Sequence, residues 1–200
     1  MNPRTTLLIL PFAIWIGSML VLPVTAWAYA LRTALTTLAL VAALVWTARH
    51  APLNWRISGR SLGIGLAAGL LVLGLWITPG LNFRFDVMRF ALLPETSAGE
   101  YTPETCGWAL TLVKLAGSAF VISAAEELFF REWLMKFAGF WWMVALFALE
   151  HDRPLVAALC GVIYGVCRLK WGLFSAVVAH AVTNLTLGAY VIAFDRWQYW

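Results

Sequence analysis

Residues 115–135 read LAGSAFVISAAEELFFREWLM, an apolar stretch that is interrupted by two adjacent acids, Glu126 and Glu127. A run of about 20 predominantly apolar residues is long enough to cross a bilayer as a helix. A carboxylate inside such a run is costly in hydrocarbon, so an intramembrane acid indicates a functional site by default. The stretch therefore predicts a membrane-spanning helix that carries part of a polar site.

The composition of the whole chain also indicates a membrane protein. Of its 200 residues, 62% are hydrophobic and 12% are charged, whereas soluble domains carry roughly 25% charged residues. A soluble chain of this size could not bury so much apolar surface, so we expect lipid as the surrounding medium. The net charge of +4 comes without a basic run, which argues against a nucleic-acid partner.

The apolar runs predict an all-α membrane bundle of about seven helices in one domain, residues 1–200. One run, over about 139–151, is too short to span and ends in the polar cluster Glu150-His151-Asp152-Arg153-Pro154, so we expect a helix that is broken near His151. The expected helices cover about 5–22, 24–47, 61–79, the stretch from Lys114 to Lys136, 139–151, 155–167 and 171–193, with the catalytic helices within about 105–193. Gly65-x-x-x-Gly69 and Gly161-x-x-x-Gly165 would permit close helix packing, although the pattern alone is weak.

Loop charges and aromatic residues predict an orientation. Arg4 and the basic loop around 49–60 are expected on the cytoplasmic face, and the acidic loop over 80–104 on the opposite face. Tryptophans near the predicted helix ends are typical of interfacial belts. The N-terminal run, followed by Ala28-Tyr29-Ala30, could instead be a secretory signal. We expect a spanning helix, because the run is long and a second one follows at once.

Three polar residues are expected at one depth. Lys114 and Lys136 are 22 residues apart, about 33 Å along a helix, so Glu126 lies near mid-membrane if both lysines reach opposite interfaces. Glu126, His151 and His180 each lie nine or ten residues from one end of their helix, roughly 14–15 Å from one membrane face. Polar groups from three helices at one depth predict a shared cavity.

The spacing of the polar residues suggests a division of roles. Glu127 and Arg131 are four residues apart and can pair on one helix face, which leaves Glu126, about 100° away, free to react. A carboxyl group in a low-dielectric cavity suits a general base that works near neutral pH, and His151 could share the proton handling. Glu132 and Glu150 are expected to be solvated or interfacial.

The last predicted helix carries a second polar pair. His180 and Asn184 are four residues apart and face the same way. Two hydrogen-bond donors on one face can stabilise a developing oxyanion. Together with a base, they predict attack of an activated water on a carbonyl, which is peptide hydrolysis inside the membrane. Ser123 lacks a base at an identifiable spacing and is disfavoured as a nucleophile; Arg32, inside the second helix, receives no role from the pattern.

Three patterns in order carry a family resemblance. Glu126-Glu127-x-x-x-Arg131, Phe147-x-x-x-His151 and His180-x-x-x-Asn184 resemble the signature motifs of the CAAX-protease and bacteriocin-processing family of intramembrane proteases, over about 120–190. Phe147-Ala148-Leu149-Glu150-His151 and Trp197-Gln198-Tyr199-Trp200 are similar to members that accompany bacterial exosortase sorting systems. The resemblance implies a protein of the bacterial inner membrane, and the loop charges predict a cytoplasmic N-terminus.

The resemblance also implies roles for the residues that match. Those at Glu126 and His151 would activate water, those at His180 and Asn184 would stabilise the oxyanion, and those at Glu127 and Arg131 would support the site. We expect a glutamate-type enzyme without a cofactor. The alternative is zinc held by Glu126, His151 and His180 with one open position.

The sequence also predicts partners, and two alternatives to a protease remain open. The expected partners are the bilayer and a membrane-anchored protein or peptide, which the exosortase-type similarity would make one with a C-terminal sorting segment. A non-catalytic membrane chaperone or immunity-type binding protein would keep the cavity only for recognition. A proton-coupled transporter would also use intramembrane acids and histidines, but usually needs more spans and a repeat, which this sequence lacks.

Overall fold

The computed structural model describes residues 2–81 and 98–200, and every regular element in them is a helix. Six helical stretches are long and apolar enough to cross a membrane, which confirms the predicted polytopic all-α bundle. They are α1 (Pro3–Val21), α2 (Ala26–His50), α3 (Gly59–Ile77), the stretch Pro103–Ala138, α9 (Pro154–Trp171) and α10 (Leu173–Phe194). Asp86 and Glu95 of the predicted acidic loop lie outside the described residues.

The short broken helix is where the sequence predicted it. α8 (Phe140–Glu150) has 11 residues, and its C-cap His151 adopts an extended backbone with φ −102° and ψ 149°. Pro154 then opens α9, as a proline tolerated in the first turn of a helix does. α9 has 18 residues and not the shorter length expected, because Arg168 lies inside the bundle and does not mark the end of the helix.

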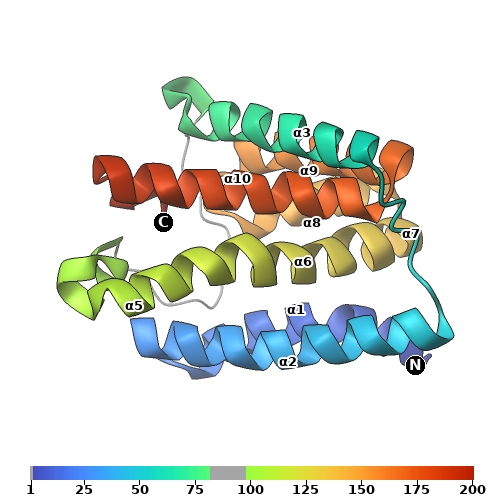
Figure 1. Ribbon diagram of the computed structural model, residues 1–200, viewed down its shortest axis with the longest axis horizontal. Coiled ribbons are helices and arrows are strands. Elements are labelled where there is room, and N and C mark those ends of the chain that lie inside the picture. The colour runs from blue at the N-terminus through green and yellow to red at the C-terminus, as the bar shows by residue number, and fades with distance from the viewer. Residues whose placement is uncertain (1, 82–97) are drawn as a thin grey trace.

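α10 runs through the middle of the bundle (Figure 1). It packs against α3 and α9 on one side, and α8 packs on α9. On its other side lies the long helical stretch that carries the acid pair, and beyond that stretch α1 packs on α2. The three predicted motifs, on the acid-bearing stretch, α8 and α10, are therefore neighbours in the interior of the bundle.

The stretch Pro103–Ala138 changes its helical period around the acid pair. α5 (Pro103–Ala116) leads into a π-helical segment, Gly117–Ile122, then α6 (Ser123–Glu126), a second π-helical segment, Glu127–Leu134, and α7 (Met135–Ala138). The acid pair straddles the junction of α6 and the second π segment. Such wide turns are rare and frequently occur at functional sites.

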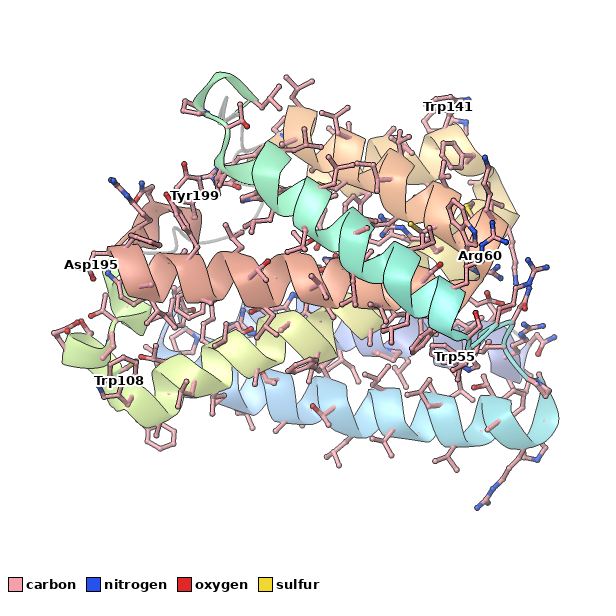
Figure 2. The ribbon with its side chains drawn as sticks, turned by 45° about the horizontal axis from the view of Figure 1, so that its top comes forward. Trp55, Arg60, Trp108, Trp141, Asp195 and Tyr199 are labelled. Atoms are coloured by element: carbon pink, nitrogen blue, oxygen red, sulfur yellow. The ribbon has the colours of Figure 1, made fainter. Side chains whose placement is uncertain are left out.

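Basic residues gather at one end of the bundle. The start of α1, the end of α2, the start of α3, α7 and the end of α9 all lie there (Figure 1). Figure 2 shows Trp55, Arg60 and Trp141 at this end, and Trp108 with Asp195 at the other. The two ends therefore carry the aromatic residues expected at membrane interfaces.

Glu132 is buried in this basic end, so the expectation that it is solvated was wrong. Its side chain is 1% exposed. Arg168 donates to Oε2 from Nη2 at 2.6 Å and from Nε at 3.2 Å. Arg4 donates to Oε1 at 3.1 Å, and Lys136 also pairs with Oε1. One carboxylate thus joins α1, the acid-bearing stretch and α9.

Close packing of α3 on α10 depends on two glycines. A Cβ atom at Gly69 would lie 2.6 Å from the carbonyl oxygen of Ala179, and one at Gly65 would lie 2.7 Å from Cγ1 of Val178. The Gly65-x-x-x-Gly69 pattern therefore marks a helix contact in this bundle. Because small residues let two backbones approach, α10 sits close enough for Thr183 to donate to the carbonyl of Gly69 at 3.0 Å.

Replacing Gly69 with alanine is expected to destabilise the protein by about 1–3 kcal/mol, since the added methyl group must push α3 away from backbone atoms. Thermal unfolding in detergent would measure the loss. Gly74→Ala is the matched control, because a Cβ atom there meets nothing within 4 Å. Equal stability of the two variants would contradict the assigned contact.

Candidate active site

Glu126 ends α6 inside the bundle, with 5% of the residue exposed. Its Oε2 atom is buried and has no hydrogen-bond partner among the described residues. Nε2 of His180 lies 3.8 Å from Oε2. That separation is too long for a hydrogen bond but short enough for the two groups to act on the same small molecule.

Glu127 holds His180 and Arg131 in place. Its Oε1 atom lies 2.9 Å from Nδ1 of His180 and 3.1 Å from Nη1 of Arg131. Because a carboxylate only accepts, Nδ1 of His180 is the donor, and Nε2 is directed to Glu126. The pairing predicted for Glu127 and Arg131 is present, while the contact with His180 could not be read from spacing.

Arg131 is 0% exposed and lies against aromatic rings. Its guanidinium carbon is 4.0 Å from the ring centroid of Phe147 and 5.4 Å from that of Tyr164. Cation–π attraction of this kind stabilises a desolvated cation by roughly 2 kcal/mol. The rings of Phe147 and Tyr164 therefore stabilise the guanidinium of Arg131, which also pairs with Glu127.

His151, the residue at the C-terminal end of α8, lies close to Glu126. Its Nδ1 atom lies 2.9 Å from the carbonyl oxygen of Phe147, which can only accept. Nδ1 therefore carries the proton, and in the neutral ring Nε2 is an acceptor. One ligand atom each of Glu126, Glu150 and His151 lie within 4.8 Å of one another. Glu150 is thus part of the site, which corrects the expectation that it is interfacial.

Asn184 is bound to the helix that carries the acids. Its Nδ2 atom donates to the carbonyl of Ser118 at 3.0 Å and to Oγ of Ser123 at 3.1 Å. Both amide hydrogens are therefore committed, and donation to an oxyanion would require one of these bonds to exchange. Ser123 in turn donates to Ser118 at 3.0 Å, and the described residues give it no histidine contact.

Tyr164 and Thr183 complete the wall behind His180, and sequence reasoning assigned neither of them a role. The ring of Tyr164 is stacked on the imidazole with 4.9 Å between centroids. Its hydroxyl donates to Thr183 at 2.7 Å. Tyr164 lies one helical turn from each of Cys160 and Arg168 on an apolar helix, where the spacing alone gave no signal.

A cavity of about 230 Å³ opens beside these groups. His151, His180 and Asn184 line it, together with Tyr164 and Phe147. Glu126 is not among the lining residues, but its Oε2 atom lies 3.8 Å from Nε2 of His180, which is. A volume of this size holds several water molecules in a polar setting, so the site has room for water and part of a chain.

The donor set partly suits a zinc ion. Glu126, Glu150 and His151 converge, and carboxylate oxygen and imidazole nitrogen are ordinary zinc ligands. His180, which the sequence offered as the third ligand, turns Nδ1 to Glu127, the arrangement that orients histidines bound to metals. The ligand set in the structure and the set predicted from the sequence both contain Glu126 and His151. The third ligand is Glu150 in the structure and His180 in the prediction.

The fold and this site define a multi-pass integral membrane protein with a buried acid–histidine centre. Residues 108–186 match the model of the Rce1-like family, described as type II CAAX prenyl endopeptidase Rce1-like. The chain is similar to this family over that segment, which contains every predicted site residue. No curated protein and no solved structure gives a significant match.

Proposed function

We propose that the protein is a glutamate-type intramembrane endopeptidase. The observation that carries the proposal is the unpartnered Oε2 atom of Glu126, held beside His180 and His151. A buried carboxylate oxygen without a protein partner is costly, unless a bound water or substrate satisfies it. The proposal assigns that place to the hydrolytic water.

The cluster geometry is compatible with one water that bridges Glu126 and His151. Their ligand atoms are at most 4.8 Å apart, and two hydrogen bonds of about 2.8 Å can reach across that gap. In the proposed step the water oxygen bonds to the peptide carbonyl carbon, and its proton passes to Glu126. The carbon–nitrogen bond then breaks, and the proton is delivered to the leaving amine.

His180 and Asn184 are proposed to stabilise the oxyanion of that step. His180 would donate from Nε2 once it is protonated, because Glu127 already accepts from Nδ1. Glu127 and Arg131 act as positioning residues, which fix the ring of His180 by one hydrogen bond and one ion pair. Preorganised donors of this type are worth several kcal/mol in a water-excluded site.

The proposed substrates are membrane-anchored proteins or peptides. The similarity to members that accompany exosortase systems favours a C-terminal sorting segment and a bacterial inner membrane. The basic end, with Arg4 and Arg60, supports a cytoplasmic N-terminus. The test is terminal-peptide mass spectrometry of membranes from cells that carry the wild type or Glu126→Gln; new termini should appear only with the wild type.

The second candidate function is a zinc-dependent protease, which the Glu126–Glu150–His151 cluster favours. Metal dependence distinguishes it from the glutamate mechanism. With the glutamate mechanism, exhaustive treatment with a strong chelator should leave cleavage by the purified protein unchanged. A loss of cleavage that zinc restores would replace the first mechanism with the second. Elemental analysis of the purified, active protein provides an independent readout.

A further inference from the structure

Tyr164 is a large, buried residue of the site to which the hydrolytic step gives no part. It belongs to α9, is 1% exposed and lines the cavity together with His180. α9 packs on α10, the helix that carries this histidine (Figure 1). The ring and the hydroxyl of Tyr164 both contact the turn of α10 that begins at the histidine.

A single hydrogen bond does not fix the imidazole of His180. Its Nδ1 atom donates to Oε1 of Glu127 at 2.9 Å, but the ring can still rotate about the line that joins these two atoms. The χ2 torsion of a histidine is broad and offers little resistance to such a rotation. In the proposed step Nε2 has to stay on the side of Glu126, so a second contact must fix the plane of the ring.

The ring of Tyr164 provides that contact. It is stacked on the imidazole of His180, with 4.9 Å between centroids and 22° between planes. Phe147 meets the same imidazole edge-on, at 6.0 Å and 80°. In a close-packed interior, rotation of the imidazole would push it against one of these rings. The bond to Glu127 therefore sets the direction of the imidazole, and the stacked tyrosine sets its plane.

The hydroxyl of Tyr164 holds the tyrosine ring in place. It donates to the hydroxyl of Thr183 at 2.7 Å. Thr183 lies three residues after His180 on α10, and its own hydroxyl donates to the carbonyl oxygens of Ala179 at 2.9 Å and Gly69 at 3.0 Å. Because Gly69 belongs to α3, contacts from three helices determine where the tyrosine ring lies.

We propose that Tyr164 is a positioning residue, whose ring holds the imidazole of His180 in the plane that the reaction needs. The kinetic consequence rests on the proposed peptidase function, whereas the effect on the imidazole does not. The proton of the tyrosine stays in its bond to Thr183, so the role involves no proton transfer. Removal of the ring should lower kcat, because misplacing a reacting group by about 1 Å can cost 10²-fold.

The kinetic test uses the peptide that the comparison of new termini identifies as substrate, with purified protein in liposomes. Tyr164→Leu removes the ring and should lower kcat by about 10²-fold with KM little changed. Tyr164→Phe keeps the stack but loses the bond to Thr183, so kcat should fall by less than about tenfold. Phe12→Leu is the matched control, because Phe12 is a buried aromatic residue that packs on Phe129 and Phe130; it should keep kcat.

The imidazole can also be observed without catalysis. The chain has three histidines, so labelling them with nitrogen-15 gives few ring signals in NMR spectra, and His180→Asn identifies the signal of His180. In the wild type its Nδ1 proton should exchange slowly with water, because it is buried and bound to Glu127. Tyr164→Leu should raise the exchange rate by about tenfold or more, and Tyr164→Phe by less.

Each outcome decides the proposal. Exchange in Tyr164→Leu as slow as in the wild type would overturn it, because other groups would then fix the ring plane. Equal losses of kcat in Tyr164→Phe and Tyr164→Leu would assign the role to the hydroxyl and overturn the role of the ring. A rise in KM alone would make Tyr164 a substrate contact, which also overturns positioning.

A second pair of variants applies if Tyr164→Leu does not fold. Tyr164→Phe and Thr183→Val remove the same hydrogen bond, so each should raise the exchange rate of the His180 proton by roughly fivefold, and the double variant should add little. No change in either variant overturns the proposal. Failure of the wild type to cleave, together with the expected exchange rates, would count against the peptidase function alone.

Discussion

Replacing Glu126 with glutamine is expected to lower the rate of peptide cleavage by about 10²–10⁴-fold, the usual contribution of a positioned general base. The amide has nearly the same shape but cannot accept a proton from water. Because Oε2 of Glu126 makes no hydrogen bond with the described residues, the substitution breaks no such bond to that atom. The loss should therefore appear in kcat and leave folding intact.

The measurement is cleavage of a membrane-anchored substrate by purified protein in liposomes, with thermal unfolding as the check on folding. Glu104→Gln is the matched control, because Glu104 is exposed in the first turn of α5 and lies 22 residues before Glu126 in the chain. Full activity in Glu126→Gln would end the glutamate mechanism. Retained biological activity without cleavage would support a binding protein that keeps the cavity for recognition.

Replacing Glu132 with alanine is expected to cost about 3–5 kcal/mol of stability, the penalty for removing one partner of a buried ion pair. The side chain of Arg168 is 8% exposed and would remain charged inside the bundle. The side chains of Lys136 and Arg4 are 51% and 38% exposed, so water can solvate them after the change. The penalty therefore arises mainly from Arg168.

A double substitution tests this assignment. Glu132→Leu combined with Arg168→Met removes both buried charges and should be markedly more stable than Glu132→Ala alone, because an apolar pair of similar volume leaves no unpaired ion. Lys136→Met should change stability by less than about 1 kcal/mol, since the lysine is half exposed. A single variant as stable as the double would show that Arg168 does not depend on Glu132. Thermal unfolding in one detergent provides the comparison.

The polar motifs could be predicted because each is local. Glu127 and Arg131 pair at the spacing of one helical turn, and the break at His151 follows from the polar cluster before Pro154. Apolar runs of spanning length fixed the helices because hydrocarbon allows few alternatives to a helix. The family resemblance rests on the same three motifs, and the family match covers them.

The contacts between helices could not be predicted in the same way. In the sequence, Glu132 and Glu150 resemble exposed acids at helix ends. In the structure Glu132 joins three helical segments, and Glu150 lies close to Glu126. Lys114 has the spacing of an interfacial lysine, but its ammonium lies over the rings of Tyr101 and of Tyr29, which is 85 residues away in the chain. No periodicity within one helix contains that information.

The sequence by itself determined that this chain is a helical membrane protein with acids and histidines at its centre, because length, apolarity and helical spacing are properties of single segments. Only the tertiary structure decided that Oε2 of Glu126 has no hydrogen-bond partner among the described residues and that Nδ1 of His180 is bound to Glu127. It also decided that Lys114 lines the cavity. Those properties depend on the approach of α10 to α3 and to the acid-bearing stretch, and hydrogen bonds between helices are set by packing distances that no single segment specifies.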